Sequence, residues 1–300
     1  MESFFVIILP LAIGYVFSKG KIFDDKAPII LNQFLIYIAL PALVLLKIPT
    51  IKIDSNVLTP IVISWVVMLS SAVLIIILSK IMNFAKDVTG SLLLVAVLGN
   101  TSFLGIPMVT SYLGNGALPY IVIYDQIGTF LALATYGTLI VSLYTNSNGF
   151  SIRDIVKKVI TFPPFIALVF ALLVGDFKYP SAIIKTFEML SATIVPLALV
   201  SVGLQLQLKL PNGTFKPFSV ALITKLIFAP LVAVLVCKIF GFSGFAVDVS
   251  ILESAMGPMI TAGVVASMAG LAPRLSASIV GYGILFSFGS VYLINLFFVS

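Results

Sequence analysis

One interrupted stretch inside an apolar run constrains this sequence more than any other feature. The run extends from Ser91 to Leu113, long enough to cross a bilayer, and it contains Gly99–Pro107 with the sequence Gly-Asn-Thr-Ser-Phe-Leu-Gly-Ile-Pro. Proline removes a helical hydrogen bond at a cost of about 3 kcal/mol and disfavours helical geometry in the preceding residue, Ile106. In lipid, freed backbone groups must be satisfied by protein, water or a ligand. The stretch therefore predicts a broken helix whose middle lines a cavity or crosses another segment.

The composition places the whole chain in a membrane. Of its 300 residues, 60% are hydrophobic and only 9% are charged, against about 25% charged residues in an average soluble domain. A spanning helix needs about 20 apolar residues, and the short connections between the apolar runs leave no room for a soluble domain. We therefore expect an all-α polytopic membrane protein, one integral membrane domain in total, with ten transmembrane helices near residues 3 to 18, 28 to 47, 57 to 82, 89 to 113, 117 to 144, 158 to 176, 181 to 205, 214 to 237, 245 to 270 and 275 to 299.

The distribution of basic residues predicts the orientation. An even number of helices puts both termini on one side, and Lys and Arg accumulate in cytoplasmic connections. The connections after the odd-numbered segments carry eleven basic residues, whereas the others carry four, namely Lys47, Lys52, Lys178 and Lys238. We expect a multi-pass protein of the plasma membrane with both termini outside. The first segment follows Glu2 rather than a basic region, so we read it as a helix and not as a signal peptide. The net charge of +6 follows largely from this distribution, so no nucleic-acid partner is implied.

The prolines indicate an internal repeat. Six of them recur in order after 151 to 157 residues: Pro10, Pro28, Pro41, Pro60, Pro107 and Pro119 are followed by Pro164, Pro180, Pro196, Pro217, Pro258 and Pro273. The alternative is a coincidental scatter of prolines, which membrane helices tolerate. The spacing favours two repeats of five helices each, residues 1–150 and 151–300. Because five is odd, the second repeat enters the membrane from the opposite side, and the two have inverted topology.

The repeat predicts a second broken helix. It falls at Glu253–Pro258, where glycine, proline and polar residues again interrupt an apolar run. We expect the fourth and ninth helices to cross each other at their broken middles. Inverted repeats with discontinuous helices at the midplane are typical of secondary transporters, whose half-helix ends face substrate and coupling ions.

Three charged residues lie deep inside apolar segments. A charge at the bilayer centre costs about 2.5–3.5 kcal/mol on insertion scales, so each is a functional hypothesis by default. Asp125 and Glu253 each lie eight residues inside their segments, and Lys225 lies nine residues after Lys216, so the three are expected to meet near the midplane. One alternative is a buried ion pair that only holds helices together. The other is a site in which Lys225 faces an anionic substrate and the carboxylates bind a coupling cation or a proton.

Polar groups and helix ends at the two breaks suit an anion. Asn100, Thr101 and Ser102 supply amide and hydroxyl groups at the first break. The short helices expected to start near Pro107 and Pro258 direct their positive ends into the cavity, and helix N-termini attract anions. We therefore predict that these five residues and Lys225 bind the substrate. The alternative for the polar triplet is that it only satisfies the broken backbone.

The opposite helix ends suit a cation. The carbonyl-rich C-terminal ends of the preceding half-helices would favour Na⁺ or H⁺. We predict that the ion-coupling residues are Asp125, Gln126, Glu253 and Ser254, and that a coupling Na⁺ would lie at Glu253, Asn100 and Thr101. Beyond such an ion, the sequence implies no cofactor.

These motifs resemble the auxin efflux carrier family, which includes plant auxin carriers and prokaryotic permeases for malate, malonate and similar acids. The resemblance rests on Gly99-Asn100-Thr101 with Gly105 and Pro107, on Ala255-Met256-Gly257-Pro258 and on Tyr124-Asp125-Gln126, and it covers the whole chain. It implies two inverted five-helix repeats, a crossover of the fourth and ninth helices, an elevator-type transport domain and often a homodimer. It also implies the fold of bile-acid sodium symporters, in which an acidic residue placed like Glu253 binds sodium.

This chain differs from the plant carriers in two features, and each limits what the resemblance implies. The connection from Thr145 to Lys158 is short, unlike the long loop of most plant carriers, which favours a prokaryotic-type permease. The second break has Glu253 and Ser254 where plant carriers have a second asparagine, so neither auxin specificity nor sodium-free transport carries over.

The function predicted from these observations is secondary active transport of a small organic anion, such as a mono- or dicarboxylate or an auxin-like acid. The alternative is a channel or an uncoupled uniporter for small anions, because broken helices also form pores. An enzyme is not expected, since the chain has no histidine for a Ser-His dyad or a histidine zinc ligand.

Overall fold

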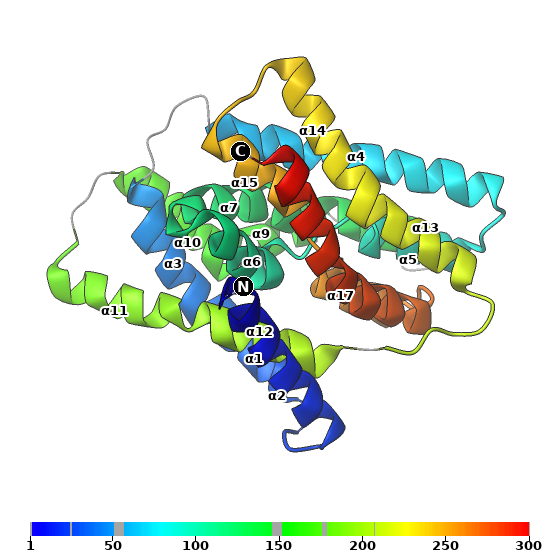
Figure 1. The fold of residues 1–300 in the computed structure, drawn as a ribbon, viewed down its shortest axis with the longest axis horizontal. Helices are drawn as coiled ribbons and strands as arrows, with labels where there is room; N and C mark the ends of the chain where they lie inside the picture. The colour runs from blue at the N-terminus through cyan, green and yellow to red at the C-terminus, as the bar shows by residue number, and fades with distance from the viewer. Residues whose placement is uncertain are drawn as a thin grey trace.

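The computed structural model describes residues 2–24, 26–50, 57–145, 152–175, 179–206 and 208–299. Within these ranges the regular secondary structure is helical (Figure 1). Two shorter apolar helices accompany six helical stretches that are long and apolar enough to cross a membrane, namely Ala27–Lys47, Leu58–Ile81, Asn115–Tyr144, Ser181–Gln205, Phe215–Phe240 and Pro273–Phe298. The chain is therefore a multi-pass membrane protein.

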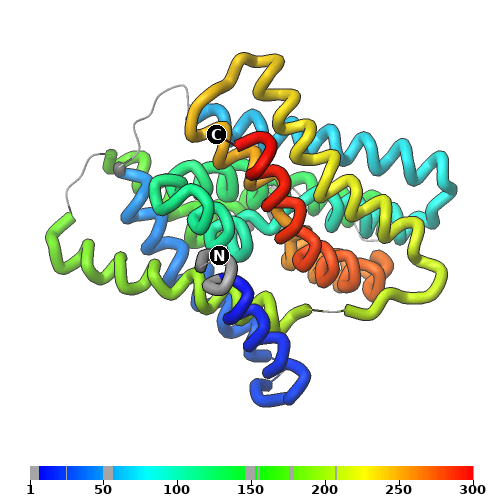
Figure 2. Tube along the Cα trace, in the orientation of Figure 1, coloured from blue at the N-terminus to red at the C-terminus, as the bar shows by residue number. Residues whose placement is uncertain are grey.

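The helices pack in two groups, as the tube along the chain shows (Figure 2). The first group contains α1 (Glu2–Lys19), α2 (Ala27–Phe34), α3 (Leu40–Lys47), α10 (Pro163–Val174), α11 (Ser181–Ala192) and α12 (Ile194–Gln205). The second contains α4 (Leu58–Ile81), α5 (Lys86–Val95), α13 (Phe215–Ile223), α14 (Ala229–Phe240), α15 (Phe245–Ser254), α16 (Ile260–Met268) and α17 (Pro273–Phe298). Between them lie α6 (Ile106–Leu113) and α7 (Leu118–Ile123), each of which contacts helices of both groups.

Two facing glycines let α1 and α12 approach closely. A Cβ placed on Gly203 would lie 2.9 Å from the backbone N of Tyr15 and 3.0 Å from Cα of Gly14. A Cβ placed on Gly14 would lie 3.1 Å from Cα of Gly203. Because backbone atoms cannot move aside as a flexible side chain does, this contact requires glycine on both helices.

Replacing Gly203 with alanine is expected to destabilise the protein by about 1–3 kcal/mol, the usual cost of overpacking. The measurement is the melting temperature of the purified protein in detergent. Gly289→Ala is the matched control, because a Cβ on Gly289 of α17 meets no atom within 4 Å. A fall in melting temperature of the same size in both variants would contradict the close contact.

Three π-helical segments each end two residues before a proline. Leu35–Ala39 precedes Pro41, Thr101–Gly105 precedes Pro107 and Thr224–Phe228 precedes Pro230. Proline cannot donate to the carbonyl four residues earlier and its ring clashes with it, so a wider turn relieves the conflict. At the third segment the hydroxyl of Ser290 donates to the carbonyl of Leu226, four residues before the proline. Pro230 offers this carbonyl no amide hydrogen, and within a membrane such a group needs a donor from the protein.

Each of the ten predicted apolar segments contains at least one helix, but the sixth differs in detail. The segment predicted at 158 to 176 contains the end of α9 (Ile152–Ile160) and the whole of α10, which are separated at Phe162, a residue with an extended backbone. The residue before a proline disfavours helical geometry, and Pro163 follows Phe162. The predicted repeat boundary at residues 150 and 151 lies outside the described residues, as do Lys52 and Lys178.

Candidate functional site

The two interruptions predicted from the sequence lie against each other. After α5, residues 96–100 are not helical, and the chain resumes as a π-helical turn at Thr101–Gly105 that continues into α6. After α15, residues 255–259 separate it from α16. Gly99 pairs with Pro258 in an isolated antiparallel bridge. The second break and the meeting of the two broken middles agree with the sequence prediction.

Backbone hydrogen bonds join the two interruptions. The amide of Asn100 donates to the carbonyl of Gly257 at 2.8 Å, and the amide of Met259 donates to the carbonyl of Leu98 at 2.9 Å. In lipid an unpaired backbone group is costly, so each interruption satisfies groups that the other has freed from its helix. The broken segments therefore form a crossing, named here by its residues 96–100 and 255–259.

The position predicted for the first break is wrong by several residues. Pro107 was expected to start the second half-helix, but helical structure begins at Thr101, and Pro107 lies one residue inside α6. The amide of Gly105 donates to the carbonyl of Asn100 at 2.9 Å, an i to i−5 bond that belongs to a π turn. This wide turn accommodates the proline, so the break moves to the residues before Thr101. Pro107 is buried beyond the crossing.

A cavity of about 90 Å³ lies beside the crossing, and we call it the crossing cavity. It is lined by the first residues of both half-helices together with mainly apolar side chains, namely Ile36, Leu40, Asn100, Thr101, Ser102, Phe103, Phe130, Leu133, Phe162, Met259, Ile260 and Thr261. Neither Asn100 nor Met259, which precede the two half-helices, caps its helix with a side-chain hydrogen bond. The side-chain amide nitrogen of Asn100 is buried without a hydrogen-bond partner. Unused donors and two positive helix ends thus converge on one cavity.

Asp125 holds the first half-helix in place. It lies in the π-helical segment Tyr124–Phe130 and is 4% exposed. Its Oδ1 accepts hydrogen bonds of 2.5 Å from the hydroxyls of both Thr101 and Ser102, and its Oδ2 accepts one of 2.6 Å from Nε2 of Gln126. Both carboxylate oxygens are therefore satisfied by protein donors, whereas Oε1 of Gln126 has no partner.

Lys225 and Glu253 line a second, smaller cavity, which we call the charged cavity. Its volume is about 20 Å³, and Gly99, Thr101, Tyr124 and Thr129 also line it. A cavity of about 10–15 Å³ holds roughly one water molecule, so this one has room for a single water or small cation. Nζ of Lys225 donates to the carbonyl of Ser254 at 3.2 Å. Both oxygens of Glu253 are buried without a hydrogen-bond partner.

Gly105 sets the position of the Glu253 carboxylate. A Cβ on Gly105 would lie 2.5 and 2.6 Å from the two oxygens of Glu253, so the carboxylate rests directly on the glycine backbone. On the other side, a Cβ on Gly99 would lie 3.0 Å from Nζ of Lys225. Gly99 of the first interruption and Gly105 of the π-helical turn after it thus leave space for charged side chains of two other helices.

The structure separates two groups of predicted site residues. Asn100, Thr101 and Ser102 line the crossing cavity, whereas Lys225 and Glu253 line the charged cavity, and Thr101 is common to both. Lys225 therefore does not line the cavity that contains the predicted substrate-binding triplet. The hydroxyl of Ser254 donates to the carbonyl of Ile251 within its own helix, and only its carbonyl takes part in the cluster. Pro258 takes part in the backbone pairing of the crossing.

Sequence reasoning missed several polar residues in or next to the charged cavity. Ser64 and Thr129 line it. Thr224 does not line it but precedes Lys225, which does, and its buried hydroxyl has no hydrogen-bond partner. The sequence positions of two of them could have identified them. Thr224 precedes Lys225, and Thr129 lies one helical turn after Asp125. The position of Ser64 could not, since serine is common in membrane helices.

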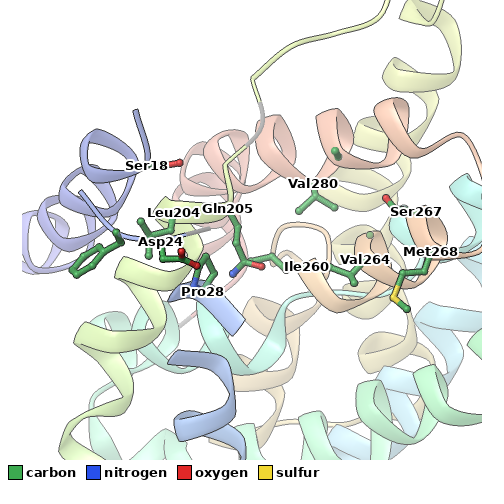
Figure 3. Close-up of a pocket in the computed structure, with 13 residues that line it drawn as sticks. Ser18, Asp24, Pro28, Leu204, Gln205, Ile260, Val264, Ser267, Met268 and Val280 are labelled. Atoms are coloured by element: carbon green, nitrogen blue, oxygen red, sulfur yellow. The ribbon is translucent and has the colours of Figure 1, made fainter. Parts of the chain in front are cut away.

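Two larger cavities adjoin the crossing cavity. One of about 450 Å³ lies between the ends of α1 and α12 and the helices α16 and α17, with Asp24, Gln205 and Ser267 among its polar residues (Figure 3). It shares Ile260 with the crossing cavity. The other, which we call the vestibule, has a volume of about 420 Å³ and shares three residues with the crossing cavity, namely Phe130, Leu133 and Phe162.

Broken apolar helices that cross at buried polar groups define a membrane protein with an internal site. Comparison with known proteins identifies it further: the chain belongs to the membrane transport protein family, whose sequence profile matches residues 1–148 and 143–295. It is 29% identical to an uncharacterized transporter of Methanocaldococcus jannaschii over 269 residues, 85% of each chain. It is 25% identical to an uncharacterized transporter of Methanothermobacter thermautotrophicus, over 88% of this chain and 87% of the other. Family membership indicates a transport protein rather than an enzyme.

Proposed function

We propose that this protein is a secondary active transporter that carries a small organic anion together with a coupling cation. The observation that carries the proposal is the crossing, because it brings two half-helix N-termini and an unpaired amide to one cavity and an unpaired carboxylate to another. Donors on one side and acceptors on the other suit ions of opposite sign. Discontinuous helices at the midplane serve this purpose in secondary transporters.

The crossing cavity is the proposed site of the anion. The backbone amides that begin both half-helices carry partial positive charge, and Nδ2 of Asn100 adds a buried donor without a partner. The hydroxyls of Thr101 and Ser102 already donate to Asp125, so their expected role is to fix the first half-helix. The remaining walls are mainly apolar, and they suit the carbon skeleton of an organic acid such as a mono- or dicarboxylate or an auxin-like acid.

The charged cavity is the proposed site of the coupling cation. When ionised, Asp125, Glu253 and Lys225 together carry one net negative charge, which one monovalent cation would balance. The unpaired oxygens of Glu253, which lines this cavity, are acceptors that Na⁺ requires, and a proton on Glu253 would balance the same charge. Gln126 and Thr224, next in the chain to Asp125 and Lys225, hold further buried oxygens without partners. The coupling cation is therefore Na⁺ or H⁺, and transport measured with each gradient distinguishes them.

The wider architecture is proposed from the same features. Ten membrane helices in two inverted repeats, residues 1–150 and 151–300, would place the two interruptions at equivalent positions, as in the fold of bile-acid sodium symporters. The packing of the helices in two groups supports an elevator, in which the second group moves against the first. The basic connections support termini outside the plasma membrane. The resemblance to auxin efflux carriers also leads us to propose a homodimer, which the molar mass in detergent would test.

A binding screen tests the proposed function directly. A ligand that binds the folded state raises the melting temperature of the purified protein. We expect stabilisation by at least one organic acid from a set that includes malate, malonate and auxin, and a larger effect when the coupling cation is present. Counterflow of that acid in proteoliposomes identifies a carrier. Single-channel conductance with no saturation by the acid would instead identify a channel, and uptake indifferent to both cation gradients would identify a uniporter.

Replacing Asn100 with alanine is expected to weaken binding of the stabilising acid about tenfold or more. A hydrogen bond to a charged group contributes about 1.5–3 kcal/mol, and the variant removes the buried donor while leaving the helix N-termini in place. The measurement is the concentration of acid that gives half of the maximal rise in melting temperature. Asn115→Ala is the control, since Asn115 is exposed. Equal affinities in the two variants would remove Asn100 from the site.

A further inference from the structure

Two stacked aromatic rings separate the crossing cavity from the vestibule. The rings of Phe130 and Phe162 lie 3.7 Å apart between centroids with an interplanar angle of 13°. Both side chains line both cavities, and Leu133 is the third residue that the two cavities share. The stack is therefore part of the wall between a cavity of about 90 Å³ and one of about 420 Å³. The vestibule reaches the surface, since Thr161, which also lines it, is exposed in the connection between α9 and α10.

The two rings belong to different parts of the fold. Phe130 ends the π-helical segment that contains Asp125, and Asp125 accepts hydrogen bonds from Thr101 and Ser102 in the π-helical turn before α6. Phe162 lies in the short non-helical link before α10, which packs on α3 in the first group of helices. The stack therefore joins the element that holds the site to the group of helices against which that site would move.

We propose that Phe130 and Phe162 form an aromatic gate between the vestibule and the crossing cavity, which a substrate entering from the vestibule must open. The role as a substrate gate rests on the proposed function, because it takes the crossing cavity as the substrate site. The gate opens when the rings separate, either by rotation of the two side chains or by movement of the two groups of helices. Because the link at Phe162 is not helical, it can move without breaking a helix.

The test measures access to the crossing cavity without any substrate. Leu40 lines this cavity and is 4% exposed, so a cysteine introduced by Leu40→Cys reports its opening. The single native cysteine, Cys237, is first replaced by alanine. The measured quantity is the rate at which a positively charged methanethiosulfonate reagent labels the purified protein in detergent.

Phe130→Ala and Phe162→Ala are each expected to raise the labelling rate roughly three- to tenfold, the factor that corresponds to the usual contribution of an aromatic pair. The double variant is expected to fall short of the product of the two single effects, because either substitution already removes the stack. Phe130→Tyr keeps a ring and is expected to label at the original rate. Phe170→Ala is the control, since Phe170 lies on α10 and is 51% exposed.

An unchanged labelling rate in both alanine variants would contradict the proposed gate, and so would a faster rate in only one of them. The melting temperature of each variant checks its folding, and Phe162→Leu replaces Phe162→Ala if the smaller residue unfolds the protein. Labelling requires neither organic acid nor coupling cation. If no acid binds but labelling is accelerated, the proposed substrate is rejected and the gate is retained. If an acid binds but labelling is unchanged, the gate is rejected and the proposed substrate is retained.

Discussion

Glu253→Gln is expected to abolish concentrative uptake while the protein continues to exchange its substrate. The carboxylate is 0% exposed, and neither oxygen has a hydrogen-bond partner, so a coupling cation is the group expected to satisfy it. Glutamine keeps the shape of the side chain and removes the charge. A tenfold gradient of the coupling cation corresponds to about 1.4 kcal/mol, so with one cation per anion the unmodified protein should accumulate substrate about tenfold. The variant should only equilibrate it.

The measurement is uptake of the labelled acid into proteoliposomes under an imposed Na⁺ or H⁺ gradient, followed to steady state. Counterflow in the same preparation shows that the variant is folded and still binds the acid. Glu188→Gln is the matched control, because Glu188 is an exposed carboxylate on α11. Accumulation by Glu253→Gln equal to that of the unmodified protein would exclude Glu253 as the coupling site. Loss of counterflow as well would assign the residue to substrate binding instead.

The crossing could be predicted from the sequence because its causes are local. Proline, glycine and polar residues that occur close together within an apolar run weaken its helix, and the spacing of Pro107 and Pro258 relates one interruption to the other. The exact place of the first interruption could not be predicted in this way. It depends on the π-helical turn that begins at Thr101 and on another helix, whose Asp125 accepts hydrogen bonds from Thr101 and Ser102 in this turn.

The charged residues illustrate a second limit. Depth along each helix predicted that Asp125, Lys225 and Glu253 would gather, and the structure brings them to the crossing. Depth gives no information on the direction in which a side chain leaves its helix. Depth therefore could not predict that Lys225 extends to the C-terminal end of α15 and does not line the crossing cavity. The sequence does not predict the stack of Phe130 on Phe162 either. Aromatic residues are frequent in this chain, and these two come together only in the folded structure.

Lys225→Met is expected to destabilise the protein while changing its affinity for the organic acid less than Asn100→Ala does. Lys225 is 3% exposed, and its ammonium group donates to the carbonyl of Ser254, at the partially negative C-terminal end of α15. Methionine preserves most of the volume and removes both the donor and the one positive charge among the described residues that line the charged cavity. A hydrogen bond from a charged group contributes about 1.5–3 kcal/mol, and the unbalanced charge of Glu253 adds to the loss.

The melting temperature at neutral pH measures the loss, with Lys185→Met as the control because Lys185 is exposed on α11. Adding Glu253→Gln should restore part of the stability, because the two substitutions remove opposite charges from one cavity and their effects are not independent. Binding of the acid decides between the two roles considered for this residue. If Lys225→Met melts like the unmodified protein and no longer binds the acid, Lys225 faces the substrate, and another conformation must bring it into the crossing cavity. If the variant is destabilised and still binds, Lys225 supplies the fixed positive charge at the end of α15.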